Sequence, residues 1–169
     1  MRKKIFAFLL LSALYAGAQE VPDWENPIVV GINKEPYHAT LTLPSQKADC
    51  KEIRSLNGKW RFQWSADPGK RPADFYKNDF NTDTWDTITV PGAWQLQGYG
   101  KPIYSNVNYP FQKDAPKVTS EPPAEYYSYG HRNPTGSYVT TFEVTPDMKD
   151  KCLYLHFEGV KSAMYVWVN

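Results

Sequence analysis

The chain has 169 residues, which is the length of about one domain. Its 19 lysines and arginines nearly balance its 18 aspartates and glutamates, so the charge gives no indication of a nucleic-acid partner. Aromatic residues make up 15% of the chain, accompanied by 14 prolines and 10 glycines. This composition indicates a β-rich domain with many turns and bulky core residues.

The first 18 residues have the pattern of an export signal. A basic cluster at residues 2–4 precedes an apolar run at 5–14, and Ala-Gly-Ala at 16–18 supplies a cleavage site. The apolar run is well short of the ~20 residues that a membrane span needs. We therefore expect a signal peptide at residues 1–18 and a mature chain that is exported, to the periplasm or the medium, with no membrane span.

Residues 19–50 are expected to form an extended arm that lies on another part of the molecule. Prolines divide this stretch into pieces too short for a helix of useful length. They are Pro22, Pro27, Pro36 and Pro44.

The cysteines and histidines give no sign of a metal site. Export would permit a disulfide between Cys50 and Cys152, but two separate thiols are equally compatible with the sequence. His38, His131 and His156 are far apart and have no ligand-type spacing. We therefore expect no metal ligand and no cofactor within this chain.

Residues 51–169 carry the strand patterns of an antiparallel β-sandwich. In the predicted strand Leu56–Trp64, aromatic residues alternate with Arg61 and Gln63, so the aromatic face should be buried. A short β-prone run follows at Thr87–Val90. The connections between the later strands are too short for crossovers, which favours antiparallel pairing. These later strands are expected at Tyr138–Val144, Cys152–Phe157 and Ala163–Val168.

Aromatic residues also gather between the first two predicted strands, without helical spacing. They are expected to cover one end of a sheet. The four residues are Phe75, Tyr76, Phe80 and Trp85.

The stretch Pro91–Pro110 interleaves aromatic residues, carboxamides and turn-forming glycines and prolines, and it contains no acidic residue. Flat apolar faces beside neutral hydrogen-bonding groups suit an uncharged, hydroxyl-rich ligand such as a sugar. The alternative is a rigid loop that packs its own aromatic side chains. The residues alone leave both interpretations open.

Five blocks of the sequence, in this order, resemble the amino-terminal region of the large bacterial β-galactosidases of glycoside hydrolase family 2. The resemblance implies that residues 51–169 form a jelly-roll β-sandwich called the sugar-binding domain. It also implies immunoglobulin-like domains and a TIM barrel further along the polypeptide. The five blocks are Asp23–Pro27, Arg54–Trp64, Val90–Pro110, Asn133–Val144 and His156–Asn169.

By the same resemblance, the barrel of the whole enzyme carries two glutamates for retaining hydrolysis of β-galactosides. Mg²⁺ and Na⁺ support that site in the family. Both glutamates and the metal ligands would lie beyond Asn169, so no catalytic residue is expected in this chain. The apolar strand expected just before Asn169 would be left at an open sheet edge, which also predicts an amino-terminal, C-terminally incomplete piece.

Substrate-binding residues are implied at one place. In the family's YxNVxYP motif the asparagine hydrogen-bonds the galactosyl ring, and here that residue is Asn106, with Val107 lining the same pocket. The alternative role of Asn106 is to cap a turn. Two departures, Ala93 in place of a carboxamide and a longer, tyrosine-rich segment at 117–131, leave the natural substrate open between lactose and a plant or host glycan.

The sequence therefore predicts the N-terminal fragment of an exported β-galactosidase, inactive by itself. Its partners would be a β-galactoside and the downstream domains, and the arm motif Asp23–Pro27 also allows a homo-oligomer. Two alternatives are another family 2 glycosidase, a β-glucuronidase or β-mannosidase, and a stand-alone exported carbohydrate-binding module. The motif at Tyr104–Pro110 favours a galactosidase, and the open edge disfavours a finished module.

Overall fold

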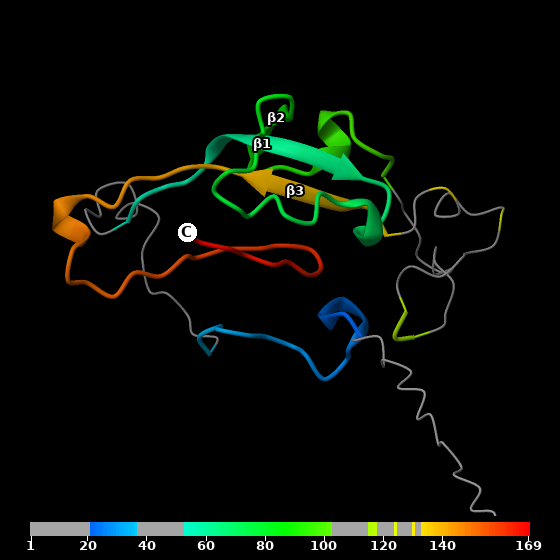
Figure 1. The fold of residues 1–169 in the computed structure, drawn as a ribbon, viewed down its shortest axis with the longest axis horizontal. Helices are drawn as coiled ribbons and strands as arrows, with labels where there is room; N and C mark the ends of the chain where they lie inside the picture. Colours follow the sequence, from blue (N-terminus) through cyan, green and yellow to red (C-terminus); the bar gives the residue numbers. More distant parts are fainter. Residues whose placement is uncertain (1–20, 37–52, 103–114, 118–123, 125–129, 131–132) are drawn as a thin grey trace, which may run out of the picture.

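The computed structural model describes residues 21–36, 53–102, 115–117, 124, 130 and 133–169 (Figure 1). Three strands within these ranges form one antiparallel sheet in the order β2-β1-β3. Its members are β1 (Gly58–Ser65), β2 (Asp86–Val90) and β3 (Thr135–Val139).

Short 3-10 helices complete the regular structure of the described ranges, and no helix there is long and apolar enough to cross a membrane. The predicted all-β, antiparallel fold class is confirmed. The 3-10 helices are η1 (Asp23–Glu25), η2 (Pro68–Lys70), η3 (Trp94–Gln97) and η5 (Pro146–Met148).

The core lies against the middle of β1. Phe62 is 0% exposed, and Ile88 on the neighbouring strand is 1% exposed. The rings of Tyr99 and Tyr138 each lie with their centroids 4.7 Å from that of Phe62. Arg61, one position before Phe62, is exposed, as the period-two pattern predicts.

The aromatic residues between β1 and β2 gather around Trp85, which immediately precedes β2 and is buried. The rings of Phe75 and Phe80 both lie 5.9 Å from the Trp85 ring. Phe75, Phe80 and Trp85 therefore gather at the end of the sheet at which β2 begins, whereas Tyr76 is exposed and stacks on Trp167.

The later strand predictions need correction. β3 spans Thr135–Val139 rather than Tyr138–Val144, and Phe142 and Val144 are exposed. Neither Cys152–Phe157 nor Ala163–Val168 forms a strand. Both segments have the alternating pattern of a strand, but a strand also needs a hydrogen-bonded neighbour, and neither joins a ladder here. In Figure 1 this part of the chain, orange to red, runs beside the sheet, reverses and ends at the label C.

The described part of the arm, residues 21–36, contacts the C-terminal segment (residues 150–169) through Trp24 of η1, which lies near the red end of the chain in Figure 1. The Trp24 ring packs edge-to-face on Tyr165, with centroids 6.1 Å apart. The Arg71 guanidinium lies over the same tryptophan, 4.7 Å from its ring centroid. These contacts place the Trp24 end of the arm on another part of the molecule, and the arm at residues 19–50 stays a prediction.

Candidate functional site

The candidate sugar-binding loop begins directly after β2. Asn106 and Val107, the predicted substrate-binding residues, lie outside the described residues, and so do Cys50, His38 and His131. The structure does describe the first part of the stretch, residues 91–102, which we call the loop base. It contains η3, which ends at Gly98 in a left-handed conformation, with φ of 98°. A glycine adopts this conformation without a Cβ clash, so the chain can turn sharply there.

The side chain of Gln97 holds the loop base to the outer edge of the sheet. Its Oε1 accepts a hydrogen bond from the Thr89 backbone N–H at 2.8 Å, and its Nε2 donates one to the Thr89 carbonyl at 3.0 Å. One carboxamide therefore satisfies both backbone groups of a residue in β2, as a neighbouring strand would do. It also fits closely over Gly92, where an added Cβ would lie 2.8 Å from Gln97 Nε2.

Two aromatic side chains of the loop base pack on the core. The Tyr99 ring meets Phe62 edge-on, and the Trp94 ring lies 6.2 Å from Phe62. This packing depends on Gly136 of β3, because a Cβ there would lie 2.7 Å from both the Phe62 and the Trp94 rings. Trp94 and Tyr99, which are half-buried, therefore pack on the core, as the packing interpretation predicts.

The Tyr99 hydroxyl donates a hydrogen bond of 2.9 Å to the Asp86 carboxylate at the start of β2. Burial of the hydroxyl, followed by this hydrogen bond and the negative charge of Asp86, raises the pKa of Tyr99. Tyr99 therefore stays protonated at neutral pH and acts as a structural hydrogen-bond donor rather than as a base. With these anchors the loop base is fixed to β1, β2 and β3 at once.

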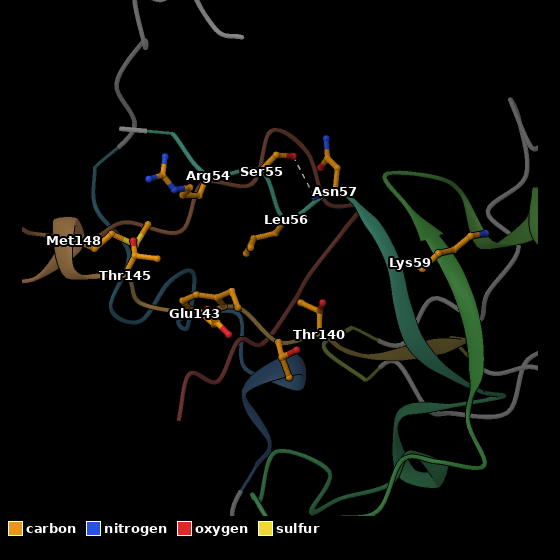
Figure 2. Close-up of a pocket in the computed structure, with 11 residues that line it drawn as sticks. Arg54, Ser55, Leu56, Asn57, Lys59, Thr140, Glu143, Thr145 and Met148 are labelled. Atoms are coloured by element: carbon orange, nitrogen blue, oxygen red, sulfur yellow. Dashed lines mark hydrogen bonds between the residues drawn. The ribbon is translucent and has the colours of Figure 1, made fainter. Parts of the chain in front are cut away.

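A polar cavity of about 320 Å³ lies at the end of the sheet where β1 begins and β2 and β3 end (Figure 2). It is formed where the segment before β1 and the segment after β3 separate. Hydroxyl and carboxamide groups line it beside an apolar surface from Leu56, Phe142 and Met148. The hydrogen-bonding groups come from Ser55, Asn57, Thr140, Thr141 and Thr145.

Arg54 and Lys59, the two basic residues of the cavity wall, are engaged with other protein groups. Arg54 Nη2 forms an ion pair of 3.0 Å with the Asp147 carboxylate. The hydrogen bond from Thr145 is the main cause that lowers the pKa of Asp147, and Arg54 lowers it further. Asp147 therefore remains ionised at neutral pH and cannot serve as a general acid. Lys59 Nζ turns away toward β2 and donates a hydrogen bond of 2.7 Å to Thr89 Oγ1. The Glu143 carboxylate also lines the cavity, so the wall offers several polar groups for binding.

The chain can now be compared with known proteins. The model of the glycosyl hydrolases family 2 sugar binding domain matches residues 53–169. The chain belongs to this family. The match includes all three strands, the loop base and the predicted binding residues Asn106 and Val107.

Named relatives share this similarity over most of the chain. The chain is 37% identical over 163 residues to the β-galactosidase of Priestia megaterium. The aligned part covers 91% of this chain and 15% of the relative. The chain is 40% identical over 154 residues to that of Clostridium acetobutylicum, covering 87% and 16%. The β-galactosidase large subunit of Lactobacillus acidophilus is 40% identical over 156 residues, covering 86% and 25%. The chain therefore spans about a seventh to a quarter of the length of these relatives.

Sequence reasoning missed two features of the site. The two hydrogen bonds of Gln97 to Thr89 were not predicted, because the sequence does not indicate which backbone groups a glutamine in a loop will bind. The polar cavity was missed because its two walls, residues 54–59 and 140–148, are far apart in the sequence. The excess of hydroxyl residues at Thr140, Thr141 and Thr145 is the one signal that could have indicated it.

Proposed function

We propose that this chain is the amino-terminal, sugar-binding part of an exported β-galactosidase. The observation that carries the proposal is the family match over residues 53–169, together with the β-galactosidases that are 37–40% identical to most of the chain. The whole enzyme would hydrolyse terminal non-reducing β-D-galactose residues with retention, through a covalent glycosyl-enzyme. Its two catalytic glutamates would come from a barrel domain later in the same polypeptide, so this chain alone would be inactive.

The contribution of this chain to the site would be one loop. Asn106 would hydrogen-bond the galactosyl ring and Val107 would line the pocket beside it. A carboxamide both donates and accepts, so it can bind a sugar hydroxyl without bringing charge into the pocket. The fixed position of the loop base, through Gln97, Trp94 and Tyr99, supports this role, because a rigid support reduces the entropy that binding costs.

Mg²⁺ and Na⁺ belong to the proposal for the whole enzyme only. In the ranges that the structure describes, His, Cys, Asp and Glu nowhere gather in groups of three or more that could hold a metal ion. These residues do not fit a metal site, and we assign no step of the reaction to a metal here.

The proposal is tested by comparing the whole polypeptide with the 169-residue chain. We expect the whole polypeptide to release nitrophenol from a nitrophenyl β-D-galactoside, and the chain alone to release none. The first sugar product, followed by NMR, should be the β-anomer, as retention requires. Faster hydrolysis of a β-glucuronide or β-mannoside would replace the galactosidase with a related glycosidase. A stop codon after Asn169 would favour a binding-only protein.

Export is tested separately. Amino-terminal sequencing of the mature protein should begin at Gln19, after removal of residues 1–18. A mature protein that retains Met1 would remove export from the proposal without affecting the enzymatic part.

The role of Asn106 is tested by Asn106→Ala in the whole enzyme. We expect kcat/KM on a galactoside to fall about 5- to 150-fold, because a polar contact left unmade costs roughly 1–3 kcal/mol. Asn108→Ala, the same change two residues later, is the matched control and should lower kcat/KM much less. Equal values for wild type and Asn106→Ala would remove Asn106 from the site.

A further inference from the structure

Asp86 stands at a position of β2 where the strand pattern calls for an apolar side chain. It is the register partner of Phe62, so the two residues lie on the same face of the sheet, and Ile88 shares that face two residues later. Phe62 and Ile88 are both buried, which makes this the core side of β2. Asp86, the first residue of the strand, is exposed. The packing of the core therefore does not require a carboxylate here, and the role of Asp86 depends on the group that it binds.

Tyr99 contacts both members of this cross-strand pair. Its ring meets Phe62 edge-on with centroids 4.7 Å apart, and its hydroxyl donates a hydrogen bond of 2.9 Å to the Asp86 carboxylate. A hydrogen bond to an ionised group is stronger than one between neutral groups. The ring contact fixes how closely Tyr99 approaches the core, and the hydrogen bond fixes its place along β2.

The loop base runs back along β2. Gln97 binds Thr89, near the end of the strand, and Tyr99 binds Asp86, at its start. These contacts follow β2 in reverse order, so the chain passes Tyr99 at the end of the sheet where β2 begins. Asn106 follows seven residues after Tyr99 in the sequence. Of the two contacts, that of Tyr99 is therefore the nearer one to the predicted substrate-binding asparagine.

We propose that Tyr99 and Asp86 are positioning residues for the reaction of the whole enzyme. Their hydrogen bond sets the direction in which the loop leaves the sheet, and through it the place of the Asn106 carboxamide against the substrate. This inference rests on the proposed function and deepens it, because it gives a role in the reaction to two residues outside the substrate-binding motif. A misplacement of about 1 Å can lower a rate by as much as 10²-fold, so a hydrogen bond at the base of the loop can matter for turnover.

The test is a double-mutant cycle in the whole polypeptide. Tyr99→Phe removes the hydroxyl and keeps the ring on Phe62, and it should lower kcat/KM on a nitrophenyl β-D-galactoside about twofold to tenfold. In an Asn106→Ala background the same change should have almost no further effect, because the carboxamide through which Tyr99 acts is already gone. An equal factor in both backgrounds would overturn the proposal, and so would a Tyr99→Phe enzyme with the kcat/KM of wild type.

Variants of Asp86 assign the effect to the hydrogen bond. Asp86→Asn keeps an oxygen that can accept from the Tyr99 hydroxyl, so it should retain most of the wild-type kcat/KM. Asp86→Ala should lose as much as Tyr99→Phe, and the two changes together should lose no more than either alone. Tyr154→Phe is the matched control, since it removes the hydroxyl of a tyrosine that is 70% exposed. A loss in Asp86→Asn as large as that in Asp86→Ala would overturn the hydrogen bond as the cause.

The outcomes also separate positioning from stability and from the proposed function. Thermal unfolding of each variant shows whether it is folded, and Asp86→Ala replaces Tyr99→Phe in the cycle if the latter does not fold. A merely structural pair would lower Tm and the fraction of active enzyme, but it would leave the factor equal in both backgrounds. A wild type that cleaves another glycoside contradicts the galactosidase, and the same cycle on that glycoside then decides the positioning role. A polypeptide that cleaves no glycoside overturns both.

Discussion

The loop base (residues 91–102) and the C-terminal segment (residues 150–169) are both rich in aromatic and apolar side chains, but they pack differently. Trp94 and Tyr99 of the loop base close over Phe62, which has no exposed surface. In the C-terminal segment Leu153, Leu155 and Phe157 alternate in the same way, yet each is at least 40% exposed.

The difference lies in the backbone rather than in the side chains. The loop base follows β2, which pairs with β1, and Gln97 hydrogen-bonds the outer edge of β2. The C-terminal segment has no ladder partner among the described residues. An alternating sequence pattern predicts which side chains share a face of a strand. The strand also needs a hydrogen-bonded neighbouring strand to hold that face against a core.

The largest expected effect on stability comes from removing a phenylalanine ring. The change is made once beneath the loop base, at Phe62, and once in the C-terminal segment, at Phe157. Phe62→Ala should lower the free energy of unfolding by about 3–5 kcal/mol, because it leaves a large cavity in the core. Phe157→Ala should cost less than about 1 kcal/mol, because 40% of Phe157 is already exposed. Urea unfolding of the whole chain, followed by tryptophan fluorescence, measures both values. Equal losses would show that the C-terminal segment is part of the core.

A second comparison adds one methyl group instead of removing a ring. Gly136→Ala should destabilise the fold by about 1–3 kcal/mol, because its Cβ would lie 2.7 Å from two aromatic rings that have no room to move. Gly159→Ala is the matched control, since no atom lies within 4 Å of its added Cβ. A Gly136→Ala protein as stable as wild type would contradict the close packing of Trp94 on β3.

A third comparison tests the hydrogen bonds that hold the loop base. Gln97→Ala should cost about 1 kcal/mol, because the two bonds to Thr89 are exposed to competing water. Gln95→Ala, which removes the other carboxamide of η3, is the control. In the whole enzyme Gln97→Ala should also lower kcat/KM on a galactoside, since the loop that carries Asn106 begins from this support. Loss of stability with unchanged kcat/KM would restrict Gln97 to a structural role.

The fold was predictable from sequence where local pattern and long-range pairing agree. The alternation around Phe62 gave the buried face of β1, and the β-prone run before Pro91 gave β2 almost to the residue. The bounds of β3 were wrong because its first residues, Thr135-Gly136-Ser137, have no apolar alternation. They form a strand because they pair with Gln63–Ser65 of β1, and Gly136 leaves room there for the Phe62 and Trp94 rings.

The site was predictable only through resemblance. A motif names Asn106 and Val107, but composition could not separate a sugar-binding loop from a packed one. Contacts between residues far apart in the sequence, such as Arg54 with Asp147 or Trp24 with Tyr165, have no local signature. The polar cavity is built from contacts of this kind, so it became visible only with the fold.

The smallest expected effect concerns the ion pair between Arg54 and Asp147. Asp147 lies in η5, at the entrance to the C-terminal segment, and Arg54 lies just before β1. Because the hydrogen bond from Thr145, assisted by Arg54, lowers the pKa of Asp147 from its ordinary value, the folded state favours the ionised carboxylate. This contribution is present above the unfolded pKa and is lost as the pH falls through the folded pKa.

We therefore expect Asp147→Asn to be slightly less stable than wild type at pH 7, and the difference to vanish in strongly acidic solution. Both groups are largely exposed, so added salt should shrink the difference at pH 7 as well. Asp79→Asn, at another exposed aspartate, should show no such pattern. A stability difference that is independent of both pH and salt would mean that Asp147 acts through the shape of η5.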